Sequence, residues 1–229
     1  MKDPYIELFD KIGLTQKRFF EIGIESIIIA SHDKLVQQWN ELKGNLENNN
    51  KKLFVRGYSP DKPKRDAFIT LIKYLFPNGN IDIDVRNNTN PTKIIAELTS
   101  LKKDKSAGKN YEIIQNYQVS HIFGRTKNPY LFNAGWNIAY IPKYLDPFTG
   151  HETVGQINSD FKEAFNIFKT KKLKYFIDDY NSIVNNKSFQ DNLTKSIAEL
   201  KKNFKMPDKS FNLLSKNAMF EFSPIEIGE

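Results

Sequence analysis

The chain has 229 residues, of which 39% are hydrophobic and 13% aromatic, enough for one large domain or two small ones with a packed core. The aromatic content excludes a disordered chain, and the lack of any cysteine excludes disulfides, thiolate metal sites and cysteine nucleophiles. The net charge of +7 favours a polyanion such as nucleic acid, although a genome that enriches Lys, Asn and Ile would produce a similar excess.

The first half of the chain alternates amphipathic segments with short apolar runs. Its opening residues carry charges and no apolar h-region, and the apolar run 22–30 is too short to span a bilayer. We therefore expect a cytoplasmic protein without membrane contact. Apolar spacing predicts helices over residues 4–13, 15–23, 33–47, 66–76 and 91–101, and strands over 52–58 and 81–85.

The second half begins after a lysine-rich stretch, 102–110, which has the composition of a linker. Strands are predicted within 111–123 and over 136–142, followed by helices over 158–169, 172–184 and 189–204. The tail, 207–229, is expected to be irregular but to pack back through its apolar residues. The fold class is thus α+β, mainly helical. Residues 1–109 form a helical and mixed region that could recognise DNA, and 110–229 carry the chemistry.

Polar residues suited to chemistry gather between residues 119 and 152. A predicted strand ends in Val119-Ser120-His121, and a loop rich in Gly, Asn and Pro follows. Asn137 then precedes the short apolar strand Ile138-Ala139-Tyr140-Ile141, and Pro142-Lys143 opens what could be a helix. This order of strand, His, loop, Asn, strand and helix resembles the HNH, or ββα-metal, nucleases.

The resemblance implies a role for each of these residues. His121 corresponds to the general base and Asn137 to the central Asn that braces the loop. Asp146, at the start of the following helix, corresponds to the metal ligand, with His151 as the second choice. The family usually has Asp or another ligand immediately before the base, whereas this chain has Ser120, a weak ligand for a hard cation, so the metal geometry is open.

Phosphodiester hydrolysis explains why these residue types are needed. A neutral imidazole can take the proton of the attacking water, and a carbonyl on its other ring nitrogen would fix the tautomer. Mg²⁺, or another divalent cation, would stabilise the leaving oxygen and the scissile phosphate. Mg²⁺ keeps several waters, so one carboxylate such as Asp146 suffices. Arg125 and Lys143 could clamp the phosphate.

Each assignment has an ordinary structural alternative. His121 could be a structural histidine, Asp146 a turn former before Pro147, and His151 a capping or surface residue. Arg125 could be a solvated charge. Asp82, Asp84 and Glu97 invite comparison with nucleases that use Asp and Glu-x-Lys, but position 99 holds Thr instead of Lys. The basic residues Arg56, Lys62, Lys64 and Arg65 could bind DNA phosphates or form a solvated loop.

By resemblance, we expect a metal-dependent endonuclease acting on double-stranded DNA, and most specifically a type II restriction endonuclease. Such an enzyme would be a homodimer, because a two-fold partner matches a palindromic site. Two alternatives stay open. One is a nonspecific HNH nuclease used in defence or as a toxin, and the other is a non-catalytic nucleic-acid-binding protein.

Overall fold

The computed structural model describes residues 2–103, 110–149 and 153–227, and this part of the chain is α+β and mainly helical. Its longer helices are α1 (Pro4–Ile12), α2 (Gln16–Glu25), α3 (His32–Asn48), α4 (Lys62–Leu75), α5 (Thr89–Thr99), α8 (Gln156–Val184), α9 (Lys187–Asn203) and α10 (Asp208–Glu221). Short helical turns are α6 (Pro129–Asn133), η1 (Gly135–Asn137), η2 (Lys143–Leu145) and α7 (Asp146–Thr149).

The strands form three separate pairs. β1 (Leu53–Arg56) and β2 (Ile81–Asp84) are parallel, as are the two-residue strands β3 (Leu101–Lys102) and β4 (Glu112–Ile113). β5 (Tyr117–His121) and β6 (Ile138–Pro142) are antiparallel, with His121 opposite Ile138. An isolated bridge from Ile28 to Tyr140 lies beyond β6, so β5 is at the outer edge of its sheet.

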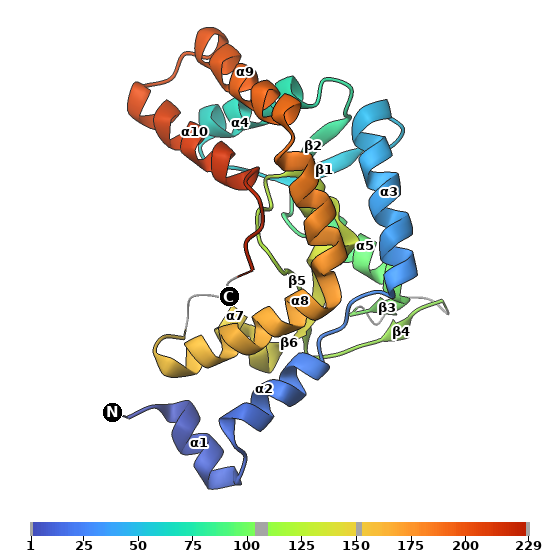
Figure 1. The fold of residues 1–229 in the computed structure, drawn as a ribbon, viewed down its shortest axis with the longest axis vertical. Helices are drawn as coiled ribbons and strands as arrows, with labels where there is room; N and C mark the ends of the chain where they lie inside the picture. Colours follow the sequence, from blue (N-terminus) through green and yellow to red (C-terminus); the bar gives the residue numbers. More distant parts are fainter. Residues whose placement is uncertain (1, 104–109, 150–152, 228–229) are drawn as a thin grey trace.

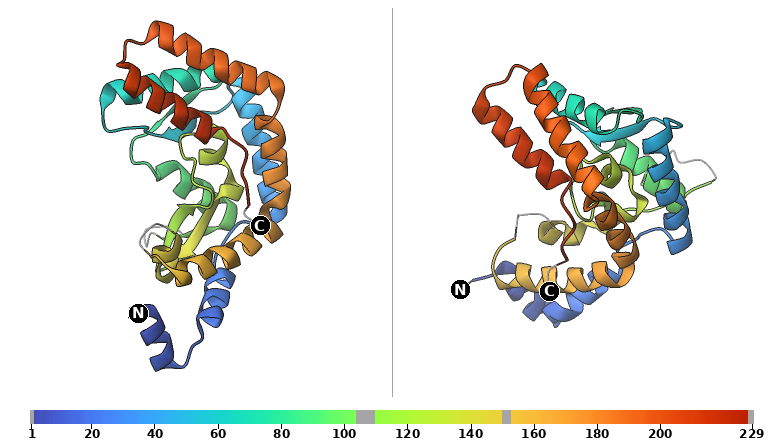
Figure 2. Two further views of the ribbon diagram at one scale, coloured as in Figure 1. Left: turned by 60° about the vertical axis from the view of Figure 1, so that its left-hand side comes forward. Right: turned by 45° about the horizontal axis from the view of Figure 1, so that its top comes forward.

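Helix α8 connects the two ends of the molecule (Figure 1). At one end it contacts α9, which packs against α4 and α10, and at the other it lies beside α2 (Figures 1 and 2). Phe161 and Phe165, in its first half, belong to a core shared with α1, α2 and α7. Phe176 and Tyr180, in its second half, belong to the main core around Trp136. The helix therefore serves two cores.

This double role explains one difference from the sequence prediction. Two helices were predicted over 158–169 and 172–184, but α8 is continuous. The apolar stripe changes direction midway because the two halves face different cores, and the change resembles an interruption when only the spacing of apolar residues is considered. No Pro or Gly breaks the intervening sequence Lys169-Thr170-Lys171-Lys172.

Two further segments predicted as irregular are helical. Residues 62–65 form the first turn of α4, which begins after Asp61 and has Pro63 in its first turn, a position that favours proline. In the tail, α10 buries Phe211, Leu214 and Ala218, whose three- and four-residue spacing forms one helical face. Beyond it Phe222 and Ile225 are buried, which confirms that the tail packs back onto the main core.

The predicted linker is described only at its two flanks. There β3 and β4 pair in parallel, while residues 104–109 lie outside the described part of the chain. Across the residues that the structure describes, no helix has both the length and the apolar character needed to cross a bilayer.

Candidate functional site

The predicted site residue His121 lies in a small polar hollow beside the outer edge of β5. The hollow has a volume of about 280 Å³. It is lined by residues from β1, from the turn before α5, from β5 and from the loop that follows β5, namely Arg56, Asn88, Gln118, Val119, Ser120, His121, Gly124 and Thr126. None of these lining residues is a carboxylate, and Arg56 carries a permanent positive charge.

His121 is the last residue of β5, and its ring is held by Phe132. The imidazole stacks on the Phe132 ring with centroids 5.2 Å apart, and Nε2 lies 3.2 Å from the Phe132 carbonyl oxygen. Because a carbonyl can only accept, Nε2 carries the proton and Nδ1 keeps its lone pair. Burial, aided by the charge of Arg56 and opposed by the Phe132 carbonyl, lowers the pKa of His121 to about 4, so the imidazole is neutral at pH 7.

Asn137 is fully buried and closes the loop between β5 and β6. Its Oδ1 accepts a 2.8 Å hydrogen bond from the Phe123 amide, and its Nδ2 donates a 2.8 Å bond to the Leu131 carbonyl. Its own carbonyl accepts from the Ile122 amide. One side chain thus holds both arms of the loop and fixes the backbone next to the Phe132 carbonyl. Asn137 therefore braces the loop, as the sequence analysis expected of it.

A second buried asparagine attaches this loop to the N-terminal half of the chain. The Asn133 amide donates to the Phe54 carbonyl (2.8 Å) and accepts from the Phe54 amide (3.2 Å), which copies the pairing of a neighbouring strand. Asn90 also donates to Asn133 Oδ1 at 2.8 Å. These bonds fix β1 and the start of α5 against the loop, although both lie far from it in sequence.

Arg56, at the end of β1, is positioned by the same attachment. Its backbone amide donates to the Thr126 carbonyl at 2.8 Å, and its Nη2 donates to Asn88 Oδ1 at 3.0 Å. Its Nε is buried without a hydrogen-bond partner among the described residues. The sequence analysis placed Arg56 with a basic DNA-binding stretch, and the structure places it in the hollow that His121 also lines.

The other basic residues of that stretch do not line the hollow. Lys62, Lys64 and Arg65 lie in the first turn of α4. Lys62 pairs with Asp66, and Lys64 pairs with Asp61 at 3.2 Å. Exposed ion pairs of this kind contribute little to stability, so Lys62 and Lys64 remain available to a polyanion.

The two residues expected to clamp a phosphate are also apart from the hollow. The Arg125 guanidinium donates to the carbonyls of Ser223 and Pro224, the latter at 2.8 Å, and lies over the Phe220 ring. It therefore ties the loop to the C-terminal segment. Lys143 is exposed at the start of η2. The pKa of Lys103 is lowered mainly by burial and secondly by the charge of Lys143.

Three side chains have oxygen atoms that could coordinate a hard cation, namely Gln118 and Ser120 on β5 and Asp146 after β6. Ser120 and Gln118 line the hollow, and the Gln118 amide donates to the carboxylate of exposed Asp146. If the nitrogen and oxygen of the Gln118 side-chain amide exchange positions, its oxygen would lie next to Asp146. Residues 150–152, including His151, lie outside the described ranges, and within those ranges no three of His, Asp and Glu converge.

The alternative acidic set has structural partners instead. Asp82 forms an ion pair with Lys52 at 2.9 Å, which holds the pKa of its carboxyl below the usual range. Asp84 is buried, and its two carboxylate oxygens accept from the backbone amides of Arg86 and Asn90. Asp84 therefore organises the turn before α5.

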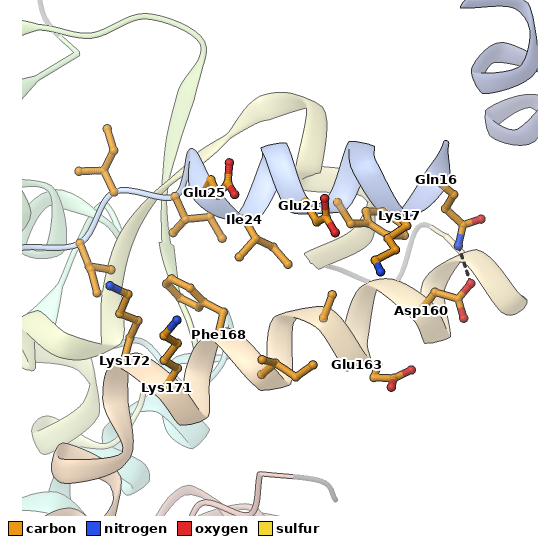
Figure 3. A pocket seen from close by; sticks show the side chains of 16 residues that line it. Gln16, Lys17, Glu21, Ile24, Glu25, Asp160, Glu163, Phe168, Lys171 and Lys172 are labelled. Carbon is orange, nitrogen blue, oxygen red and sulfur yellow. Dashed lines mark hydrogen bonds between the residues drawn. The ribbon is translucent and has the colours of Figure 1, made fainter. Parts of the chain in front are cut away.

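A second, larger hollow of about 1100 Å³ lies between α2 and α8 (Figure 3). Apolar side chains line both of its sides, among them Ile24 on α2 and Phe168 on α8. Charges of both signs stand along its length, and Gln16 donates to Asp160 at one end. No histidine of the described residues lines it, and its acidic and basic side chains do not converge on one point.

Sequence reasoning missed three polar members of the hollow at β5. Gln118 shares a strand face with Ser120, since the two are two residues apart, and this period could have identified it. Asn88 and Thr126 come from turns that carry no motif, and only the long-range contacts of β1 bring them beside His121.

Comparison with known proteins gives one family. The family model described as "Uncharacterised protein PM1201" matches residues 30–227, a range that contains the whole hollow. The uncharacterized protein PM1201 of Pasteurella multocida (strain Pm70) is 34% identical over 225 residues, which cover 98% of each chain. No solved structure matches the chain.

Proposed function

The chain belongs to the family of the uncharacterised protein PM1201, and we propose that it is a metal-dependent DNA endonuclease of the HNH, or ββα-metal, kind. The observation that carries this proposal is the state of His121, a neutral imidazole whose Nε2 donates to a backbone carbonyl and whose Nδ1 is left as an acceptor in a polar hollow. The proposal is supported by the antiparallel pair of β5 and β6, which is followed, after η2, by the four-residue helix α7.

His121 would act as the general base. Its Nδ1 takes a proton from a water molecule, and the oxygen of that water attacks the phosphorus of the scissile diester while the bond to the leaving oxygen breaks. The Phe132 carbonyl stabilises the imidazolium formed in this step, because it already accepts from Nε2. Asn137 keeps that carbonyl in place by holding the neighbouring Leu131 carbonyl.

A divalent cation, Mg²⁺ in the first instance, would supply charge stabilisation for the phosphate and the leaving oxygen. The donors that fit it are the Asp146 carboxylate with Gln118 and Ser120, an all-oxygen set of the kind that Mg²⁺ prefers. His151 remains a further candidate ligand by resemblance. The low carboxylate content of this set suits an ion that retains most of its waters.

Double-stranded DNA is the proposed substrate. The net charge of +7 favours a polyanion, and Lys62, Lys64, Arg65 and Lys143 are proposed to contact its backbone. Within this class we favour a type II restriction endonuclease that acts as a homodimer in the cytoplasm. Residues 1–109 would then contribute to DNA recognition, while 110–229 contain the catalytic histidine.

The experiment is cleavage of plasmid and phage DNA by the purified protein with Mg²⁺ or with EDTA. Discrete fragments that require the metal are the expected result. A smear with the same metal dependence would keep the nuclease and replace the restriction enzyme with a nonspecific one. Binding of DNA without cutting under any divalent metal would contradict the proposal and favour a non-catalytic nucleic-acid-binding protein.

A further inference from the structure

The polar hollow beside β5 has the chemistry of an anion site. Among its eight lining residues there are one permanent cation, Arg56, one histidine and several neutral hydrogen-bonding groups, but no carboxylate. A lining with this charge attracts an anion. The Asp146 carboxylate is hydrogen-bonded to Gln118 but is not itself part of the lining. Arg56 is therefore the residue that an anion in the hollow would contact.

The nitrogen atoms of the Arg56 guanidinium differ in their hydrogen bonding. Nη2 donates to Asn88 Oδ1 at 3.0 Å, whereas Nε is buried and has no partner among the described residues. An arginine fork recognises phosphate oxygens through parallel hydrogen bonds, and Nε is one of the donors it uses. A buried donor without an acceptor costs free energy. Because Nε is shielded from solvent, a phosphate oxygen would recover that cost once the Arg56 side chain turns Nε toward the hollow.

The backbone that carries Arg56 is rigidly placed. The Arg56 amide donates to the Thr126 carbonyl, and two residues earlier the Phe54 backbone makes both a donor and an acceptor bond with Asn133. Thr126 and Asn133 belong to the loop that Asn137 braces. Arg56 and His121 are thus parts of one framework, although 65 positions separate them in the sequence.

We propose that Arg56 binds the scissile phosphate in the hollow and presents it to His121. This inference rests on the proposed nuclease function and adds a catalytic residue from the N-terminal half of the chain, together with Asn88 as a positioning residue. Arg125, which would otherwise fill this role, is occupied by the carbonyls of Ser223 and Pro224.

The first test uses a readout that does not depend on catalysis. Inorganic phosphate is titrated into the full-length protein while the ring ¹⁵N signals of its three histidines are followed by NMR. A saturable shift of the His121 signal in wild type, lost in Arg56→Ala and weakened in Arg56→Lys, is expected. Arg18→Ala is the matched control, because Arg18 is an exposed arginine on α2 with its own partner, Glu21.

The second test measures DNA cleavage and DNA binding separately. Arg56→Ala should lower the single-turnover cleavage rate by about 10²-fold or more and weaken DNA binding in Ca²⁺ by less than about tenfold, because the contact strengthens as charge develops. Arg56→Lys should recover part of the rate, and Asn88→Ala should lose about three- to tenfold.

The outcomes separate this inference from the proposed function. If wild type does not cut DNA but the phosphate shift depends on Arg56, the anion site stands and the nuclease is rejected. If wild type cuts and Arg56→Ala cuts at the same rate, or if phosphate shifts the His121 signal equally in both, the role of Arg56 is overturned. Equal loss in Arg18→Ala would likewise overturn it, since any lost positive charge would then suffice.

Discussion

The hollow beside β5 and the hollow between α2 and α8 differ in size and in chemistry, and the smaller of these two carries the functional proposal. The hollow between α2 and α8 is about 1100 Å³ and is lined by apolar side chains together with acidic and basic ones. The hollow beside β5 is about 280 Å³, yet it brings together a histidine of fixed tautomer, neutral polar side chains and an arginine whose buried Nε has no hydrogen-bond partner among the described residues. The proposal is placed in the smaller hollow because polar groups converge there, and not because of its volume.

The surroundings of the two hollows differ as well. The larger hollow lies between two helices packed side by side. Its lining comes from α2, from residues 27–29 and from α8. The hollow beside β5 depends on a loop whose asparagines, Asn128, Asn133 and Asn137, are all buried and hydrogen-bonded. They fix the loop to the C-terminal helices, to β1 and to itself, respectively. A site held in this way is preorganised.

The largest effect should come from His121. We expect His121→Ala to lower the single-turnover rate of DNA cleavage by about 10²- to 10⁴-fold, the range that removal of a general base produces. DNA binding in Ca²⁺ should stay within about threefold of wild type. His32→Ala is the matched control, because His32 is exposed on α3 and should leave the rate unchanged. Equal rates for wild type and His121→Ala would contradict a catalytic role of His121 and of the hollow beside β5.

Asn137 should be important for stability rather than for chemistry. Asn137→Ala removes the partners of the Phe123 amide and the Leu131 carbonyl, and each unsatisfied group costs about 1–3 kcal/mol. Urea unfolding should therefore show a loss of about 2–5 kcal/mol in the free energy of unfolding. Asn192→Ala, at an exposed position of α9, should change it by less than about 0.5 kcal/mol. A small loss in Asn137→Ala would mean that the loop is not braced in this way.

The low pKa of His121 predicts a dependence of stability on pH. The pKa is about 4 in the folded chain and near 6.5 when unfolded, so between these values the unfolded chain binds a proton that the folded chain does not. Stability should thus fall as the pH drops from 6.5 toward 4, by up to about 3 kcal/mol from this group. His121→Asn should lose that part of the slope in urea titrations, whereas His32→Asn should keep it. Parallel curves for wild type and His121→Asn would show that His121 titrates normally.

The smallest effect on the cleavage rate is expected for substitutions in the hollow between α2 and α8. Ile167 is an exposed residue of its lining, 63% accessible, and Ile167→Ser should keep the cleavage rate within about twofold of wild type. The same cleavage assay measures it, with Arg56→Ala alongside. A loss comparable to that of Arg56→Ala would show that the hollow between α2 and α8 takes part in the reaction.

The sequence predicted the parts of this arrangement that are local. The order of strand, loop and strand around His121 and Asn137 follows from apolar runs and turn residues, and the two strands pair with those residues at the predicted ends. The bracing role of Asn137 was expected from the resemblance and agrees with its hydrogen bonds. The α+β class was predicted from the same patterns.

The remaining features depend on contacts between distant segments. Nothing near Arg56 in the sequence indicates that β1 pairs with the Asn133 amide, so its place beside His121 was not predictable. Arg125 looked equally suitable for phosphate, but its guanidinium meets the C-terminal segment, which was expected to be irregular. The continuous α8 was missed because its apolar stripe serves two cores.

The most direct test of the central claim is a double-mutant cycle of His121→Ala and Arg56→Ala, read as single-turnover rates of DNA cleavage with Mg²⁺. If the two side chains act on one phosphate, the double variant should be only slightly slower than the slower single variant, because residues that act as a unit are strongly non-additive. If the two losses multiply, His121 and Arg56 act independently, and the hollow beside β5 is not a single catalytic site.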